Sequence, residues 1–280
     1  MRRGPDDLTP SHGSGKPDPC DQVLDRGVCH HGPVPVLPGA EPFAGGDGAV
    51  GVVVTHGFTG SPASTVPWGR HLVEAGFRVV VPRLPGHGTH WRDLQRTRWR
   101  DWFDEVRRAH ATLAAECDHV VAAGLSVGGA LSLRLAEVEP TLAGVVVVNP
   151  SLATARRDAP FARFLAPLVA SFPGVANDIA KPGQDEVGYD RLPLKAVVSL
   201  QQLWGVVTAD LGRITCPVRL FRSRVDHVVE PRSAEVLAAG LTVPLQETVL
   251  EDSFHVATLD NDAPAVFDGT VAFIRSVVTS

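Results

Sequence analysis

Short runs of apolar, mostly β-branched residues alternate along this chain with longer stretches whose apolar residues recur every three or four positions. Several of the short runs are apolar on both faces, which is typical of strands covered by helices on either side. Strands that alternate with helices indicate an α/β domain with a mainly parallel sheet. The predicted strands are residues 51–57, 77–84, 119–125, 144–150, 217–223 and 245–252.

The predicted helices lie between these strands. The clearest one, residues 99–117, places Trp99, Trp102, Phe103, Val106, Ala109 and Leu113 on a single stripe. Others cover residues 64–76, 127–139, 232–240 and 263–278. Gly76 and Gly240 close two of them, and Pro140 follows a third, as expected of helix ends.

One interval breaks this alternation. More than sixty residues separate the strand 144–150 from the next strand at Pro217, which is too long for a structureless connection in a compact domain. We therefore expect a helical cap, residues 151–206, inserted into a core made of 34–150 and 207–280. Its apolar residues are expected to form a small core and to roof an apolar pocket: Phe161, Phe164, Leu165, Leu168, Phe172 and Trp204.

The N-terminal residues 1–33 are rich in Pro, Gly, Asp and His and are predicted to form a flexible tail. They have no apolar stretch typical of a secretory signal. Cys20, Cys29, His30 and His31 match no usual zinc spacing, so we predict no metal site.

Composition and charge exclude several classes of protein. A net charge of −5 argues against a surface for nucleic acid or an anionic membrane, which needs clustered Lys and Arg. No apolar run approaches the length of a transmembrane span, about 20 residues. The four cysteines form no CxxC pair, which fits a reducing compartment, and a cytoplasmic protein is expected. Oligomeric state is left open.

The segment GLSVGG, residues 124–129, stands where a predicted strand passes into a predicted helix. A serine alone could be an ordinary helix cap. The flanking glycines, Gly124 and Gly128, favour the tight turn of a G-x-S-x-G motif, which exposes the hydroxyl of Ser126 at the carboxyl edge of the sheet. The serine is therefore a candidate nucleophile.

A serine hydroxyl needs a base to accept its proton. In this architecture the acid and then the histidine follow the serine, and only His227 and His255 do so. His255 comes directly after the last predicted strand and is our candidate base. Asp226, at the end of the strand 217–223, is the candidate acid, with Asp252 as the nearest rival.

Acyl transfer also needs donors for the oxyanion. The N–H of Val127 follows the serine directly. A second donor is expected in the loop after the strand 51–57, where we choose the N–H of Phe58, with His56 and Gly57 shaping the loop. His87 is interpreted as structural.

Five segments in this order, HGFTGSP, RLPGHG, GLSVGG, SRVDHVV and SFHVATLD, make residues 34–278 resemble the serine α/β-hydrolases, and more narrowly bacterial carboxylesterases and monoacylglycerol lipases. The resemblance implies an eight-stranded sheet, a small helical cap, no cofactor, and hydrolysis of short to medium acyl esters or monoacylglycerols. Ser126, Asp226 and His255 match the triad positions of that family, and Phe58 and Val127 match its oxyanion donors, although Met or Leu is commoner at position 127.

The expected partner is thus a small-molecule ester or lipid substrate. The same triad also serves thioesterases and amide hydrolases, and a non-catalytic ligand-binding protein on a hydrolase fold is the alternative outside enzymes.

Overall fold

The structure, a computed structural model, describes residues 35–155 and 161–279. The predicted tail, residues 1–33, lies outside the described residues. So do Cys20, Cys29, His30 and His31, which were weighed and set aside as metal ligands.

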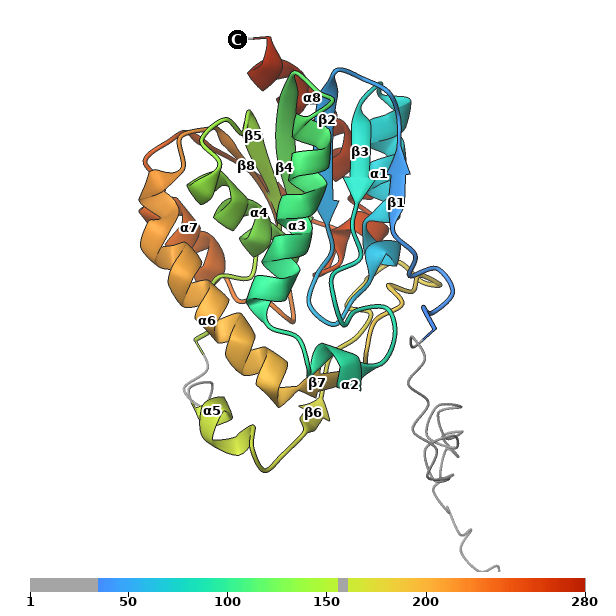
Figure 1. Cartoon of the computed structure of the whole chain (residues 1–280), viewed down its shortest axis with the longest axis vertical. Helices are drawn as coiled ribbons and strands as arrows, with labels where there is room; N and C mark the ends of the chain where they lie inside the picture. The colour runs from blue at the N-terminus through green and yellow to red at the C-terminus, as the bar shows by residue number, and fades with distance from the viewer. Residues whose placement is uncertain (1–34, 156–160, 280) are drawn as a thin grey trace, which may run out of the picture. The chain divides into compact units, whose positions relative to one another are not determined.

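The described residues form one main sheet of seven strands in the order β1-β3-β2-β4-β5-β8-β9, and only β1 with β3 is antiparallel within it (Figure 1). All six predicted strands are present. The expectation of eight strands in the main sheet is wrong for the described residues, which form seven. The strand bounds are β1 Phe43–Gly45, β2 Val50–Thr55, β3 Arg78–Val81, β4 His119–Leu125, β5 Gly144–Val148, β8 Val218–Ser223 and β9 Leu245–Leu250.

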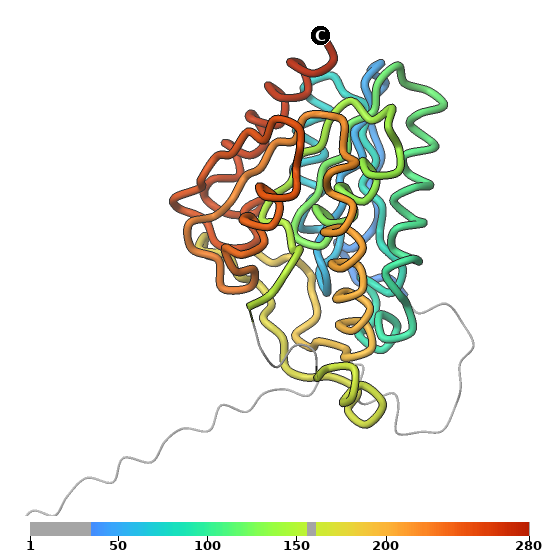
Figure 2. Tube along the Cα trace, turned by 90° about the vertical axis from the view of Figure 1, so that its left-hand side faces the viewer, coloured from blue at the N-terminus to red at the C-terminus, as the bar shows by residue number. Residues whose placement is uncertain are grey.

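Helices cover both faces of this sheet (Figures 1 and 2). Along β2 the side chains alternate: Val53 packs in the cluster of α3, α4, α6 and α7, whereas Val52 and Val54 pack in the cluster of α1 and α8. This alternation explains why the strand is apolar at successive positions. The helix bounds are α1 Val66–Glu74, α2 Trp91–Leu94, α3 Trp99–Ala114, α4 Val127–Val138, α5 Ala162–Leu165, α6 Leu194–Asp210, α7 Arg232–Gly240 and α8 Ala263–Val278. Short 3₁₀ helices span Pro62–Ser64, Leu211–Arg213 and Ala257–Leu259.

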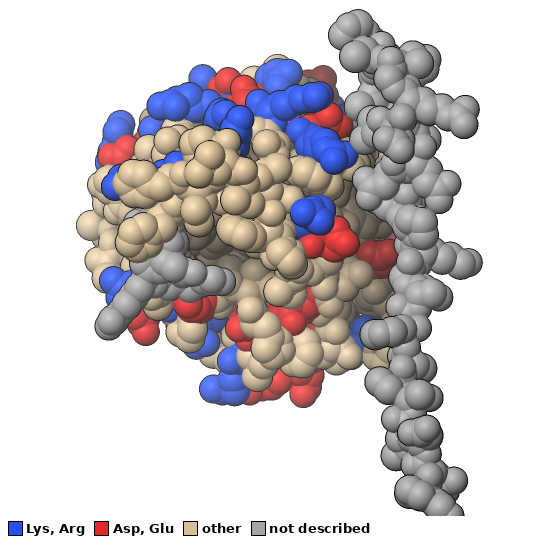
Figure 3. Space-filling model, turned by 90° about the horizontal axis from the view of Figure 1, so that it is seen from below, with Lys and Arg blue, Asp and Glu red and all other residues tan. Residues whose placement is uncertain are grey.

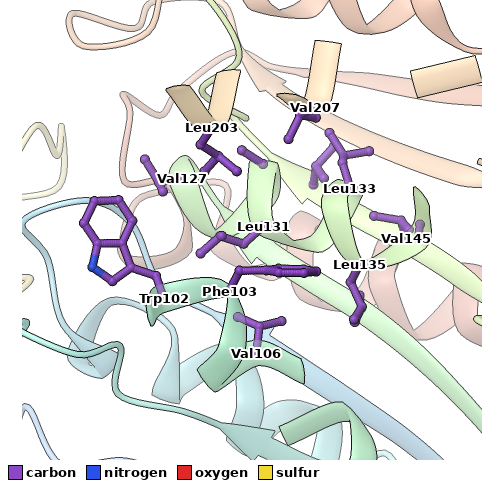
Figure 4. Packing of buried hydrophobic residues seen from close by; sticks show 14 of the residues in the cluster. Trp102, Phe103, Val106, Val127, Leu131, Leu133, Leu135, Val145, Leu203 and Val207 are labelled. Carbon is purple, nitrogen blue, oxygen red and sulfur yellow. The ribbon is translucent and has the colours of Figure 1, made fainter. Parts of the chain in front are cut away.

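Helix α4 lies between α3 and α6, as Figure 4 shows. Leu131 of α4 faces Trp102 and Phe103 of α3, and Leu203 of α6 packs on the same buried cluster. The helix that begins at the candidate nucleophile is therefore held from both sides, which limits its movement.

Both local and long-range contacts define the helix ends, and the glycine expected after α1 is present. Gly76 follows α1 with a φ of +95°, a conformation that a glycine adopts without steric cost. At the start of α3 the Asp101 carboxylate accepts the main-chain N–H of Arg98 at 2.7 Å. The Ser199 hydroxyl, on α6, accepts the N–H of Trp99 at 2.8 Å, so α6 caps α3.

The described part of the connection between β5 and β8 contains two α-helices, a short 3₁₀ helix and a small sheet. Helix α5 and helix α6 are separated by two antiparallel strands, β6 Ser171–Pro173 and β7 Arg191–Pro193, which the sequence analysis did not anticipate. Helix α6 runs past the predicted boundary at residue 206 and packs against α4 through Leu200, Leu203 and Val207.

We call the residues from α5 to β7 the cap. The expected apolar core of this cap is not formed by the residues predicted for it, because five are exposed and only Trp204 is half-buried; the exposed ones are Phe161, Phe164, Leu165, Leu168 and Phe172. The four residues of α5 offer too short a face to bury them. The parallel strands point toward the end of the molecule that carries the cap (Figure 1). Seen from that end, the middle of the surface is largely uncharged and hollowed, with Lys and Arg gathered along one rim (Figure 3).

Candidate active site

Ser126 stands between the last residue of β4 and the first residue of α4, with a φ of 55° and a ψ of −116°. A positive φ is costly for a residue with a side chain and persists where the surroundings enforce it. The surroundings require glycine on both sides: a Cβ on Gly124 would lie 2.2 Å from the carbonyl of Gly128, and one on Gly128 would lie 2.1 Å from the carbonyl oxygen of Thr55. The turn predicted from GLSVGG is present.

Asp226 and His255 form a buried pair. The Nδ1 of His255 lies 2.8 Å from Oδ2 of Asp226, and each side chain is 8% exposed. The other oxygen of Asp226 accepts the N–H groups of Val228 and Val229 at 2.8 and 2.7 Å. The predicted acid is thus fixed on both oxygens, whereas the rival Asp252 is exposed.

The pKa values of this pair move apart. Burial alone would lower the pKa of His255, but the hydrogen bond and the charge of Asp226 outweigh it, and the pKa is raised above 6.5. Burial likewise opposes the charge on Asp226, yet the bonds from His255 and from two main-chain N–H groups hold the pKa of this carboxyl below its usual range. The arrangement favours an imidazolium beside a carboxylate.

Main-chain and side-chain hydrogen bonds at the end of β5 connect Ser126 to the loop that carries His255. The N–H of Ser126 donates to Val148 O at 2.9 Å, and the next residue, Asn149, donates its side-chain amide to the carbonyl of His255 at 2.8 Å. Within the described residues Ser126 Oγ makes no hydrogen bond with the His255 ring. The structure therefore brings Asp226 and His255 into contact and places Ser126 at the end of β4, which β5 separates from β8.

The loop after β2 lies against Ser126. A Cβ on Gly57 would be 3.4 Å from the Cβ of Ser126, which is van der Waals contact, so this loop packs directly beside the serine. Burial lowers the pKa of His56 to about 4, which keeps its ring neutral. The neutral ring donates from Nδ1 to Gly57 O at 2.9 Å and accepts the N–H of Leu84 at Nε2, 3.1 Å away.

The two predicted oxyanion donors are the N–H groups of Phe58 and Val127. Neither donates a hydrogen bond elsewhere in the described part of the chain. Val127 begins α4, whose positive N-terminal end favours negative charge. The ring of Phe58 packs against Trp102, with centroids 5.6 Å apart. His87 is buried, with Nδ1 3.1 Å from Pro85 O.

Comparison with known proteins agrees with this geometry. The model of the "Alpha/beta hydrolase family" matches residues 52–268, more than half of the chain. The chain belongs to the alpha/beta hydrolase family. This alpha/beta hydrolase is 37% identical over 245 residues to the thermostable monoacylglycerol lipase of Bacillus sp. (strain H-257), a match covering 85% of this chain and 96% of that protein.

Two further relatives support the assignment of this alpha/beta hydrolase. It is 28% identical over 246 residues to a carboxylesterase of Bacillus subtilis (strain 168), covering 86% of this chain and 98% of that protein. A solved structure described under "LipS and LipT, two metagenome-derived lipolytic enzymes" matches with a TM-score of 0.83 and 37% identity, over 86% of this chain and all of that one. The protein is an enzyme of this family.

The structure also places residues near this hydrolase's candidate triad that the sequence analysis missed. They lie in the cap between β6 and β7: the Glu186 main chain accepts the hydroxyl of Ser61 at 3.0 Å, and Tyr189 N donates to Thr59 O at 2.9 Å. Burial raises the pKa of Glu186, and its carboxylate faces the charge of His255. Asp178 of the same segment bonds to His227 and to His255. The sequence did not indicate these contacts, because they join residues far apart in the chain and the segment has no periodic pattern of apolar residues.

In the described residues, no three His, Cys, Asp or Glu side chains are grouped as metal ligands. None of the described helices is long and apolar enough to cross a membrane. The expected compartment remains a prediction.

Proposed function

We propose that this protein is a serine hydrolase that cleaves carboxylic esters through an acyl-enzyme intermediate, with Ser126 as nucleophile, His255 as base and Asp226 as acid. The observation that carries the proposal is the buried pair of Asp226 and His255, 2.8 Å apart, at the same edge of the sheet as the strained Ser126 turn. A pair of this kind accepts a proton from a neighbouring hydroxyl and stabilises the resulting positive charge.

The reaction then follows from the residues around the serine. His255 accepts the proton of Ser126 while the oxygen attacks the ester carbonyl, and the N–H groups of Phe58 and Val127 hold the oxyanion. The alcohol leaves with a proton from His255. Water, activated by the same ring, then releases the acid and restores the serine. A rotation of the Ser126 side chain toward His255 precedes the attack.

The proposed substrates are esters with uncharged acyl chains, including monoacylglycerols. Two features support this choice: the relatives named monoacylglycerol lipase and carboxylesterase, and the largely uncharged surface at the cap end of the molecule (Figure 3). A charged acyl group would require a paired charge on the enzyme.

The test is hydrolysis of p-nitrophenyl butyrate by wild type and Ser126→Ala, with labelling by a fluorophosphonate. We expect Ser126→Ala to lose about three or more orders of magnitude in kcat/KM and all labelling. Ser276→Ala, an exposed serine on α8, is the matched control and should keep both. Retention of activity in Ser126→Ala would refute the nucleophile. Faster turnover of matched thioesters or amides than of esters and monoacylglycerols would refute the substrate class.

A further inference from the structure

Asp178, in the cap between β6 and β7, is a buried carboxylate, 9% exposed, with partners on two other loops. Its Oδ2 accepts the main-chain N–H groups of His227 and of His255, each at 3.2 Å. Its Oδ1 lies 2.7 Å from Nδ1 of His227, which donates to it. Its own main-chain carbonyl accepts the N–H of Val256 at 3.1 Å.

These partners belong to the two loops that carry the candidate acid and base. His227 directly follows Asp226, and the second N–H is that of His255 itself. The two loops also touch each other, because the His227 ring packs edge-on against Phe254, with centroids 4.7 Å apart. One carboxylate of the cap therefore bonds to both halves of the Asp226–His255 pair.

We propose that Asp178 is a positioning residue for the hydrolysis proposed above: from the cap, it ties the acid loop and the base loop together and so holds the His255 ring in line with Ser126. The proposal rests on that function. A carboxylate suits the task, since one carboxylate accepts several hydrogen bonds and its charge strengthens each of them.

The position of Asp178 has an electrostatic consequence as well. The charges of three carboxylates act on His255: Asp226 from the acid loop, and Asp178 and Glu186 from the cap. The other titratable side chain in contact with Asp178 is His227. The charge of Asp178 favours the imidazolium form that His255 takes during the reaction. A residue that acted only as a loop support would have no such effect.

The experiment compares Asp178→Asn with wild type in steady-state hydrolysis of p-nitrophenyl butyrate across pH. The change keeps the size of the side chain and removes its charge. We expect kcat to fall on the order of tenfold while KM changes by less than about threefold, because alignment and not substrate binding is impaired. The pKa of His255 should fall, so the acid limb of the pH profile should move to lower pH. Asp190→Asn, exposed on the same segment, should match wild type.

A second variant, His227→Phe, keeps a ring against Phe254 and the main-chain N–H bond to Asp178, and loses only the side-chain bond from Nδ1. This variant should lower kcat several-fold. If Asp178→Asn does not fold, the kcat of His227→Phe tests whether the bonds of Asp178 position His255. Unchanged kcat in the soluble variants would overturn the proposal, and so would a fall in kcat of Asp178→Asn without movement of the acid limb. Failure of the proposed function is a different result: the wild type would then neither react with the fluorophosphonate nor depend on Ser126.

Discussion

The side-chain amide of Asn149 donates to the main-chain carbonyl of His255 at 2.8 Å, although 106 positions separate the two residues. The same amide bonds to Ser223 in both directions: Nδ2 donates to Oγ at 2.9 Å, and Oδ1 accepts the N–H at 2.8 Å. Asn149 directly follows β5 and Ser223 is the last residue of β8, so this one side chain joins two strand ends to the loop that carries His255. Its φ of 44° lies in the left-handed region, which asparagine tolerates better than most residues.

Replacing Asn149 by alanine should therefore impair both stability and catalysis. The change leaves buried groups of Ser223 and His255 unpaired, which costs about 1–3 kcal/mol in the free energy of unfolding. It also frees the base loop, so kcat should fall more than KM rises. Urea unfolding and steady-state kinetics measure the two effects. Asn261→Ala is the control, since that exposed amide bonds only to Asp252 O at 2.9 Å within the described residues; equal losses in both variants would contradict the role of Asn149.

The pH dependence of hydrolysis should follow His255. A base must be neutral to accept a proton, and the pKa of His255 is raised above 6.5, so kcat/KM should fall as the pH drops through a value higher than 6.5. Asp226→Asn removes the largest interaction that raises this pKa. That variant should lose about 10⁴-fold in kcat and show its acid limb at lower pH. Rates between pH 5 and 9 test both expectations, and an acid limb below 6.5 in the wild type would disprove the first.

The glycines of the serine turn provide a steric prediction. In Gly128→Ala the new Cβ would lie 2.1 Å from Thr55 O, so the loop after β2 must move and activity should be lost together with stability. Gly205→Ala is the matched control, because that helical position of α6 has no atom within 4 Å of the new Cβ. It should stabilise the fold by roughly 0.5–1 kcal/mol through the higher helix propensity of alanine. Thermal unfolding with activity assays separates the two, and an active Gly128→Ala would show that the turn tolerates a side chain.

The sequence was sufficient to predict six of the seven strands of the main sheet in the described residues, and the serine turn. Buried parallel strands are continuous apolar runs, and β4 and β5 show this in almost every residue. The order of Ser126, Asp226 and His255 along the chain is likewise visible, because each follows a predicted strand. Strand β1 was missed, since its three residues, Phe43–Gly45, form no apolar run and owe their conformation to pairing with β3.

The cap contacts could not be predicted for a related reason. Asp178 binds the N–H groups of residues 49 and 77 positions away, and every residue but proline has such a group, so no pattern of side chains marks the partner. Strands β6 and β7 have three residues each, and the loop between them is rich in Gly and Asp. Local sequence predicts a turn there, but it does not indicate that this loop contacts the loops of Asp226 and His255.

The buried Glu137 of α4 should make stability depend on pH. Burial raises its pKa from 4.5 to about 7, although Arg134, 2.7 Å away, favours the charged form. The folded state therefore keeps a proton that the unfolded chain releases, and the contribution of Glu137 to stability is full below pH 4.5 and is lost as the pH rises to 7. Relative to Glu137→Gln, the wild type should lose up to about 3 kcal/mol between pH 4.5 and 7.5. Urea unfolding of both at several pH values measures this difference, with Glu235→Gln, exposed on α7, as the control. A difference that stays constant with pH would show that Glu137 is already ionised in the folded protein at pH 5.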